Sequence, residues 1–184
     1  MIEHFYERVP GYFDFPDVYR HAVQWLPDGG TFVEVGCWQG QSLAFLLVEA
    51  ANSGKRLRVF GCDHFIGSVD ACHGIKSVGA HCMHHLRRAG YPFSLIHADS
   101  TAGAGYFGDG SIDYLFIDAG HLYHEVKADL QAWIPKVRPG GIAAGHDFNH
   151  ADVERAVREE FPGRDIEHLG ATSWTWGSCW RVQL

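Results

Sequence analysis

Two short stretches in the second half of the sequence combine aspartate with histidine. The stretch at 116–123 reads FIDAGHLY and contains Asp118 and His121. The stretch at 141–148 reads GIAAGHDF and contains His146 and Asp147. Each includes an apolar run that predicts the end of a buried strand. Because the carboxyl ends of neighbouring parallel strands converge on one crevice, we expect these four side chains to lie together.

Two carboxylates and an imidazole have the chemistry of a divalent-cation site. Oxygen ligands favour Mg²⁺ or Mn²⁺, and a nitrogen ligand shifts the preference towards Mn²⁺, Fe²⁺ or Zn²⁺. A bound cation would lower the pKa of a substrate hydroxyl, and a nearby histidine could accept the proton. The alternative is that Asp118 and Asp147 only cap turns and helix ends.

A glycine turn lies near the start of the chain, where 31–40 reads TFVEVGCWQG. Gly36 allows backbone to approach a ligand, and Gly40 opens a helix whose N-terminal amides attract carboxylate or phosphate. The dinucleotide fingerprint G-x-G-x-x-G is absent, because Trp38 replaces its middle glycine. Glu34 suits a cationic ligand with an amino-acid end. A strand–turn–helix that simply needs glycines is the alternative.

Apolar runs alternate with helical patterns along the chain, which predicts an α/β fold with helices on both faces of a mostly parallel sheet. We expect strands at 31–35, 57–62, 93–97, 112–117, from 142, 166–169 and 173–182. We expect helices at 17–25 and 152–161, capped by Asp17 and Asp152, and at 41–51, 81–89, within 101–110 and at 123–133.

Length and charge limit the classes of function. The 184 residues predict one domain, with 1–30 as an N-terminal helical segment covering the site. The net charge of −7 argues against a nucleic-acid partner. No stretch approaches the roughly 20 apolar residues that span a membrane. Five cysteines without regular spacing favour a reducing, cytoplasmic location. A domain this small could pair with a second copy to cover its site.

The glycine turn resembles motif I of the class I S-adenosyl-L-methionine-dependent methyltransferases. The later stretches, I-D-x-x-H-x-Y and P-G-G-x-x-x-x-H-D, resemble a bacterial stand-alone group related to the metal-dependent sugar O-methyltransferases of macrolide biosynthesis and to cephalosporin-type methyltransferases. The resemblance runs from about 31 to 161. It implies a Rossmann-like, doubly wound, seven-stranded sheet with an antiparallel last strand, and S-adenosyl-L-methionine as cofactor.

The resemblance also implies roles for particular residues. Asp63 would bind the ribose hydroxyls, and Asp99 and Ser100 would lie beside the adenine. The full set expected at the cofactor is Glu34, Gly36, Gly40, Ser42, Asp63, His64, Asp99, Ser100 and Asp118.

At the reacting end, the resemblance makes Asp118 and Asp147 metal ligands and His121 the general base. This chain has His146 where the macrolide enzymes have an acidic residue. His146 is therefore expected either as a nitrogen ligand beside the two aspartates or, in an enzyme without metal, as a base alongside His121.

The expected reaction is O-methylation of a small hydroxylated metabolite, a sugar or natural product, with possible Mg or Mn assistance. Two other classes stay open: a nucleotide- or NAD-binding oxidoreductase and a non-catalytic cofactor-binding module. The predicted terminal hairpin argues against the oxidoreductase, whose sheet continues with parallel crossovers.

A cluster of cysteines and histidines and a cluster of tryptophans are both interpreted as structural rather than as ligand-binding. A zinc site is discounted because the spacing of its candidate ligands lacks the paired geometry of common sites. Those candidates are Cys72, His73, His81, Cys82, His84 and His85. The loop at 65–80 is expected to contribute to substrate selectivity. Trp174, Trp176 and Trp180 alternate with small residues, which predicts sheet packing.

Overall fold

The protein folds into a seven-stranded sheet with helices on both faces. The computed structural model describes residues 1–66, 77–170 and 178–184. The strands are β1 (Thr31–Val35), β2 (Arg58–Asp63), β3 (Ser94–His97), β4 (Ile112–Ile117), β5 (Val137–Gly145), β6 (Glu167–Leu169) and β7 (Cys179–Gln183). The α-helices are α1 (Pro16–Trp25), α2 (Gln41–Ser53), α3 (Val78–Arg87), α4 (Ser100–Gly103), α5 (Tyr123–Trp133) and α6 (Ala151–Glu160). Short 3₁₀ turns are η1 (Tyr6–Arg8), η2 (Ala104–Tyr106) and η3 (Ile134–Lys136).

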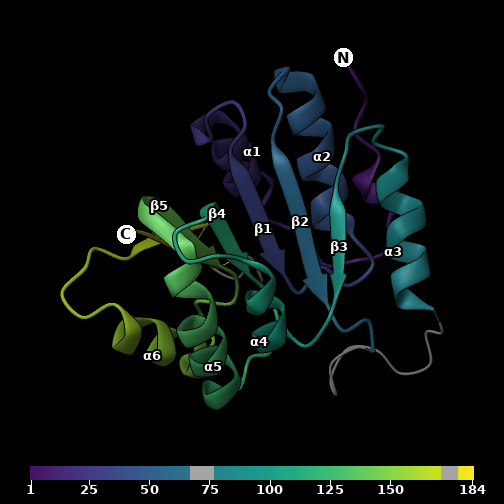
Figure 1. Cartoon of the computed structure of the whole chain (residues 1–184). Coiled ribbons are helices and arrows are strands. Elements are labelled where there is room, and N and C mark those ends of the chain that lie inside the picture. Colours follow the sequence, from purple (N-terminus) through teal and green to yellow (C-terminus); the bar gives the residue numbers. More distant parts are fainter. Residues whose placement is uncertain (67–76, 171–177) are drawn as a thin grey trace.

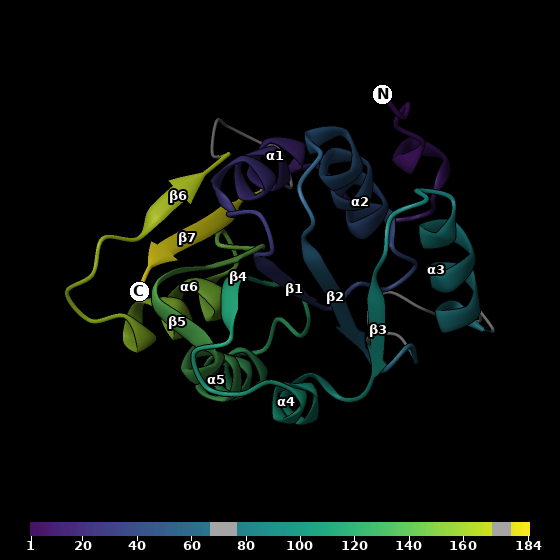
Figure 2. The ribbon, with the colours of Figure 1, turned by 45° about the horizontal axis from the view of Figure 1, so that its top comes forward.

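The strand order is β3-β2-β1-β4-β5-β7-β6; Figure 1 labels β3, β2, β1, β4 and β5, and Figure 2 also labels β7 and β6. Neighbours from β3 to β5 are parallel, and β7 is antiparallel to both β5 and β6. The predicted mostly parallel sheet with an antiparallel last strand is confirmed. The order reverses between β1 and β4, which makes the carboxyl ends of these two strands the topological switch point, where ligands of such sheets bind.

Two layers of helices enclose the sheet: α1, α2 and α3 cover one face, and α4, α5 and α6 cover the other (Figure 2). Alternate residues of β4 enter the two cores, as the period of a strand requires. Tyr114 and Phe116 pack with the first layer of helices, whereas Leu115 and Ile117 pack with the second. A strand buried on both faces holds its ends in fixed positions, and the site residues follow directly from such ends.

Several predicted boundaries are wrong for local reasons. Asp17 does not cap α1; the N-cap is Phe15, and the Asp17 carboxylate instead accepts a hydrogen bond from Arg20 at 2.7 Å. Asp152 does not cap α6, which begins after His150. The Asp152 carboxylate accepts a hydrogen bond from the Tyr123 backbone at 3.3 Å and so ties α6 to the start of α5.

β5 begins at Val137, earlier than expected, because the proline–glycine stretch that predicts a turn is part of the strand. Gly140 donates to the carbonyl of Leu184 at 2.7 Å, and Leu184 donates to Gly141 at 2.9 Å. These two hydrogen bonds to the last residue of the chain pair the backbone of the proline–glycine stretch, so it can continue the strand. The register with β4 is irregular between Ile112 and Tyr114.

Some predictions fall outside the described residues: most of the loop at 65–80, Cys72 and His73 of the discounted zinc cluster, and the strand start at 173–177 with Trp174 and Trp176. Trp180 is buried in the sheet, as expected. Within the described part of the chain, no helix is long and apolar enough to cross a membrane.

Candidate active site

The glycine turn after β1 brings the ends of three strands together. Gly36 has φ +86°, and a Cβ there would lie 1.9 Å from the carbonyl oxygen of Asp118, so only glycine allows the end of β4 to come so close. The Gly36 amide donates to Cys62 at the end of β2. Gly40, with φ +84°, precedes α2, and a Cβ there would meet Cys82 at 3.0 Å. The turn is thus packed against β2, β4 and α3.

Asp63 fastens this turn to the end of β2. Its Oδ2 accepts a hydrogen bond from the Trp38 amide at 2.8 Å, and its Oδ1 accepts one from the Phe65 amide at 2.5 Å. The neighbouring His64 has a side chain that is 40% exposed. Both residues lie at the carboxyl edge, next to the turn, and their contact with a cofactor stays a prediction.

Glu34 lies beneath the turn with no exposed surface. Its Oε1 accepts hydrogen bonds from the Tyr19 hydroxyl at 2.8 Å and the Ser42 hydroxyl at 2.5 Å, which link α1 and α2 to β1. Burial raises the pKa of Glu34 to about 8, although the two hydrogen bonds oppose that rise. The observed contacts of Glu34 and Ser42 are structural, and direct contact with a cofactor stays a prediction for both.

Asp99 and Ser100 follow β3 and start the short helix α4. The Asp99 carbonyl accepts the Gly103 amide at 2.9 Å, and the Ser100 carbonyl accepts the Trp133 indole N–H at 2.9 Å. The Asp99 side chain is exposed and Ser100 is partly buried. They lie on the side of β2 away from β4, so they could meet a different part of an extended ligand from that near Asp118.

Asp118, His121 and Asp147 come together at the ends of β4 and β5. Nε2 of His121 lies 2.9 Å from Oδ2 of Asp147. Each of the three residues offers a ligand atom, and these atoms lie within 4.8 Å of one another. The side chains of Asp118, His121 and Asp147 are 22%, 45% and 25% exposed. Among the described residues, this is the group that could hold a metal ion.

His146 lies on the other side of Asp147 and is not in that group. Its Nδ1 is 3.1 Å from Oδ2 of Asp147 and 3.7 Å from Oδ1 of Asp118. Its Nε2 is 3.3 Å from Oδ1 of Asp14, outside hydrogen-bond geometry. The ring also packs on Phe15, with centroids 4.8 Å apart. In the group that could hold a metal ion the nitrogen ligand is His121, and ligation by His146, whose Nδ1 faces the same two aspartates, stays a prediction.

These carboxylates set the protonation of the histidines. Burial lowers the pKa of His146, but the bond to Asp147 and the charges of Asp118, Asp147 and Asp14 outweigh it and raise that pKa to about 9. The bond to Asp147 also raises the pKa of His121. At neutral pH His146 therefore holds its proton.

The pKa values of Asp118 and Asp147 are shifted in opposite directions. Burial raises the pKa of Asp118 to about 6, and the charge of His146 opposes that rise. Burial also acts to raise the pKa of Asp147, but its bonds to His121 and His146 outweigh burial and hold that pKa below its ordinary value. Asp147 is therefore the firmest anion of the cluster.

The backbone at Asp147 adopts an unusual conformation that serves this arrangement. Its φ is +56°, in the left-handed region that a residue with a side chain rarely occupies. Such strain concentrates at functional sites. Just before it, a Cβ on Gly145 would lie 2.6 Å from the Ile117 carbonyl, so β4 and β5 approach closely at their ends. The carboxylate of Asp147 thereby lies between His121 and His146.

Sequence reasoning missed the residues before α1 that reach this site. Asp14 approaches His146, and Tyr12, which is 81% exposed, stacks on Trp38 with ring centroids 5.8 Å apart. The segment 1–30 is helical in η1 and α1, but it meets the site through residues between them that have no helix or strand. A signal was available, because 12–15 reads YFDF, an alternation typical of a chain with two different faces.

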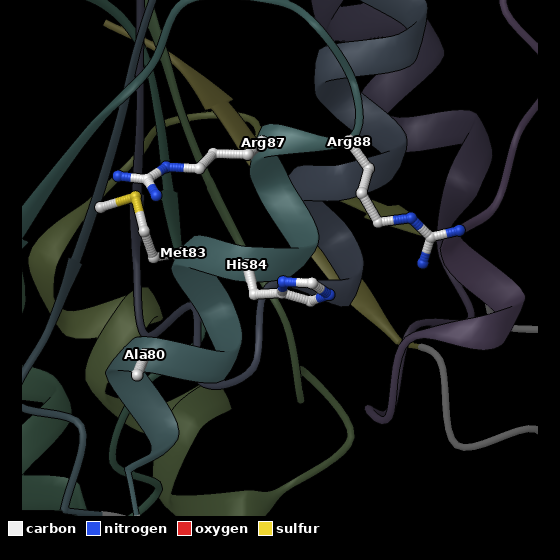
Figure 3. A pocket seen from close by; sticks show the side chains of 5 residues that line it. All are labelled: Ala80, Met83, His84, Arg87 and Arg88. Atoms are coloured by element: carbon white, nitrogen blue, oxygen red, sulfur yellow. The ribbon is translucent and has the colours of Figure 1, made fainter.

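A separate shallow hollow lies on the surface of α3 and contains none of these residues. It is lined by Ala80, Met83, His84, Arg87 and Arg88 (Figure 3). Cys82, on the same helix, is buried against the glycine turn and away from the exposed histidines. Among the described residues, the discounted zinc cluster does not assemble.

Comparison with known proteins decides the family. A family model described as a methyltransferase domain matches residues 33–148, which is more than half of the chain and includes the turn, Asp63 and the cluster at Asp118. The chain belongs to this methyltransferase family. The methyltransferase expected from the sequence is thereby confirmed over the oxidoreductase that was its alternative.

The solved structures that this methyltransferase resembles share its fold. An S-adenosylmethionine-dependent O-methyltransferase from Thermotoga maritima has a TM-score of 0.68 and 15% identity, covering 95% of this chain and 67% of that chain. A TDP-rhamnose 3′-O-methyltransferase of calicheamicin biosynthesis has a TM-score of 0.65 and 18% identity, covering 91% and 76%. An rRNA methylase from Streptococcus thermophilus has a TM-score of 0.65 and 15% identity, covering 94% and 98%.

A curated relative matches a smaller share of this chain than the solved structures do. The uncharacterized protein y4gI of Sinorhizobium fredii is 29% identical over 115 residues, which make up 62% of this chain and 13% of that protein. The chain thus spans a small part of the length of the curated relative that it matches.

Proposed function

We propose that this methyltransferase transfers the methyl group of S-adenosyl-L-methionine to a hydroxyl of a small metabolite, a sugar or another natural product. The observation that carries the proposal is the close pair of His121 and Asp147, with Nε2 2.9 Å from Oδ2, beside Asp118 at the switch point of the sheet. A hydroxyl must lose its proton to attack the sulfonium methyl. A histidine oriented by a carboxylate is a common device for taking such a proton.

His121 is the better of the two candidate bases. The Asp147 carboxylate beside Nε2 favours the neutral tautomer with its proton on Nε2, which leaves Nδ1 as the acceptor. The His121 side chain is 45% exposed, which leaves room for a substrate. His146, with a pKa raised to about 9, already carries its proton at neutral pH. We assign His146 the role of offsetting the negative charge of the aspartates around it.

Asp118, His121 and Asp147 also fit a divalent cation, because two carboxylates and an imidazole have ligand atoms within 4.8 Å of one another. A bound Mg²⁺ or Mn²⁺ would lower the pKa of a substrate hydroxyl, and the nitrogen ligand favours Mn²⁺. The two arrangements give His121 different tasks: it holds the metal in one and takes the proton in the other. In both, Asp147 is needed to keep His121 in place.

A small substrate is favoured over nucleic acid by charge. The fold is shared with an rRNA methylase, so the fold alone does not separate the two classes of substrate. However, the net charge is −7 and the site contains Asp14, Asp118 and Asp147. Phosphate backbones bind clustered Lys and Arg, and such an acidic mouth repels them.

The proposal is tested by measuring S-adenosylhomocysteine formation with a panel of hydroxylated acceptors. The variants are His121→Ala and, as the matched control, the exposed His124→Ala on α5. We expect His121→Ala to reduce the rate by about 10²–10⁴-fold and His124→Ala to leave it unchanged. A full rate in His121→Ala would overturn the assignment. A protein that binds S-adenosylhomocysteine but methylates no acceptor would favour the non-catalytic module.

Repeating these rates with a chelator and then with added Mn²⁺ separates the two tasks of His121. Loss of rate with the chelator and recovery with Mn²⁺ would support the ligand task. Rates that do not respond to either addition would leave His121 as the base of an enzyme without metal.

A further inference from the structure

A short segment before α1, residues 11–15, has no helix or strand and crosses the carboxyl edge of the sheet; we call it the strap. It begins where Gly11 packs on Gln41, since a Cβ on Gly11 would lie 2.5 Å from the Gln41 side chain. Tyr12 then stacks on Trp38, after β1, and Asp14 approaches His146, after β5. Because β4 lies between β1 and β5, the strap passes beside the end of β4, where Asp118 is found.

The two faces of the strap have different surroundings. Phe13 and Phe15 pack into the core, with Phe13 against Tyr19 and Phe15 stacked on Phe116 at 4.9 Å. Tyr12 is 81% exposed, and the Asp14 side chain is 40% exposed. The exposed Tyr12 and Asp14 thus alternate along the chain with the partly buried Phe13 and the buried Phe15.

The Tyr12–Trp38 pair is an aromatic platform at the mouth of the site. The two rings are almost parallel, with 7° between their planes, and Tyr12 keeps one face free. The indole N–H of Trp38 is buried and has no hydrogen-bond partner among the described residues. Trp38 itself has φ +39°, a strained conformation that holds its ring beneath Tyr12. A flat ring could stack on the free face of Tyr12.

We propose that the strap is the substrate-binding wall of the site and that it takes a ring carrying hydroxyl groups. The ring face would stack on Tyr12, and a ring hydroxyl would donate a hydrogen bond to Asp14. The matched family domain begins at residue 33, so this wall belongs to the part of the chain outside the shared domain. The inference rests on the proposed function, because it places the ring next to His121 and Asp118.

Two kinds of ring have this chemistry, a pyranose sugar and a phenol, and two probes distinguish them. Methyl α-L-rhamnopyranoside and catechol would be titrated into the protein saturated with S-adenosylhomocysteine, with binding followed by saturation-transfer NMR. We expect Tyr12→Ala to weaken binding of the preferred ring about fivefold to tenfold and Tyr12→Phe to retain it. Asp14→Asn should weaken it about fivefold, because the hydroxyl loses a charged acceptor.

Tyr106→Ala is the matched control, since Tyr106 is 71% exposed and lies in η2, outside the strap. It should leave ring binding unchanged. S-adenosylhomocysteine affinity should stay within about twofold in all four variants, which shows that each one folds.

Binding of the rhamnoside alone assigns a sugar, and binding of catechol alone assigns a phenol; both support the strap. Equal binding by Tyr12→Ala and the unmodified protein would overturn the proposal, as would a cofactor-loaded protein that binds neither ring. Ring binding that depends on Tyr12 and Asp14, without any methyl transfer, would support the strap as a binding wall but contradict the proposed function.

Discussion

His121 and Asp147 lie side by side at the ends of β4 and β5, with Nε2 of the histidine 2.9 Å from Oδ2 of the aspartate. Asp147→Asn removes the carboxylate that orients the ring, so we expect methyl transfer to fall by about 10²–10⁴-fold. Asp152→Asn, on the adjacent helix α6, is the control and should keep its rate. Steady-state rates of S-adenosylhomocysteine formation check this, and an active Asp147→Asn would contradict the pairing.

Asp63 carries a prediction about the cofactor. Its carboxylate already holds the amides of Trp38 and Phe65, and the resemblance gives it the ribose hydroxyls as well. Asp63→Ala should weaken S-adenosylhomocysteine binding at least about tenfold in calorimetric titrations, because both the turn and the ribose lose an acceptor. Asp109→Ala, an exposed aspartate paired with Lys136, should bind normally. Equal affinities would remove Asp63 from the cofactor site.

Gly36 and Gly54 allow a test that separates close approach from backbone strain. Both have positive φ, at +86° and +72°, but a Cβ would meet the Asp118 carbonyl at 1.9 Å only at Gly36 and would meet nothing at Gly54. We expect Gly54→Ala to cost about 1–2 kcal/mol of unfolding free energy. Gly36→Ala should cost more than about 3 kcal/mol, because β4 must move. Equal costs in urea denaturation would show that the approach of β4 is unimportant.

Glu34 predicts how stability changes with pH. Its pKa is about 8 in the folded protein against 4.5 ordinarily, so the folded protein holds a proton that the unfolded chain releases. The contribution of Glu34 to the unfolding free energy is therefore present below about pH 4.5 and is lost as the pH rises towards about 8. Glu34→Gln removes this dependence and should gain stability relative to the natural protein between these pH values.

Urea denaturation across that pH range measures the difference, with the exposed Glu7→Gln as control. A Glu34→Gln protein whose stability follows the same pH curve as the natural protein would mean that Glu34 is ionised in the fold.

Sequence patterns predicted the elements with clear local signals better than the boundaries that depend on distant contacts. The bounds of β1, β4 and α5 were all predicted, because each is an apolar or amphipathic run with clear breakers. The start of β5 was not, since 138–141 reads RPGG and its partner, Leu184, comes from the far end of the chain. Contacts of that kind depend on tertiary structure and leave no local pattern.

The same distinction holds for the site. The convergence of Asp118, His121 and Asp147 follows from topology, because all three come after neighbouring parallel strands. The approach of Asp14 to His146 joins residues far apart in the sequence, and no spacing rule predicts it. The charge of Asp14 adds to those of Asp118 and Asp147 in raising the pKa of His146.

The most direct test of the account is to identify the atom that receives the methyl group. The protein would be supplied with S-adenosylmethionine carrying a ¹³C-labelled methyl group and a hydroxylated acceptor from the panel, and the product examined by NMR. We expect a methyl ether carbon that appears with the natural protein and is lost with His121→Ala. A methyl group on nitrogen or carbon, or a methyl ether formed equally well by His121→Ala, would contradict it.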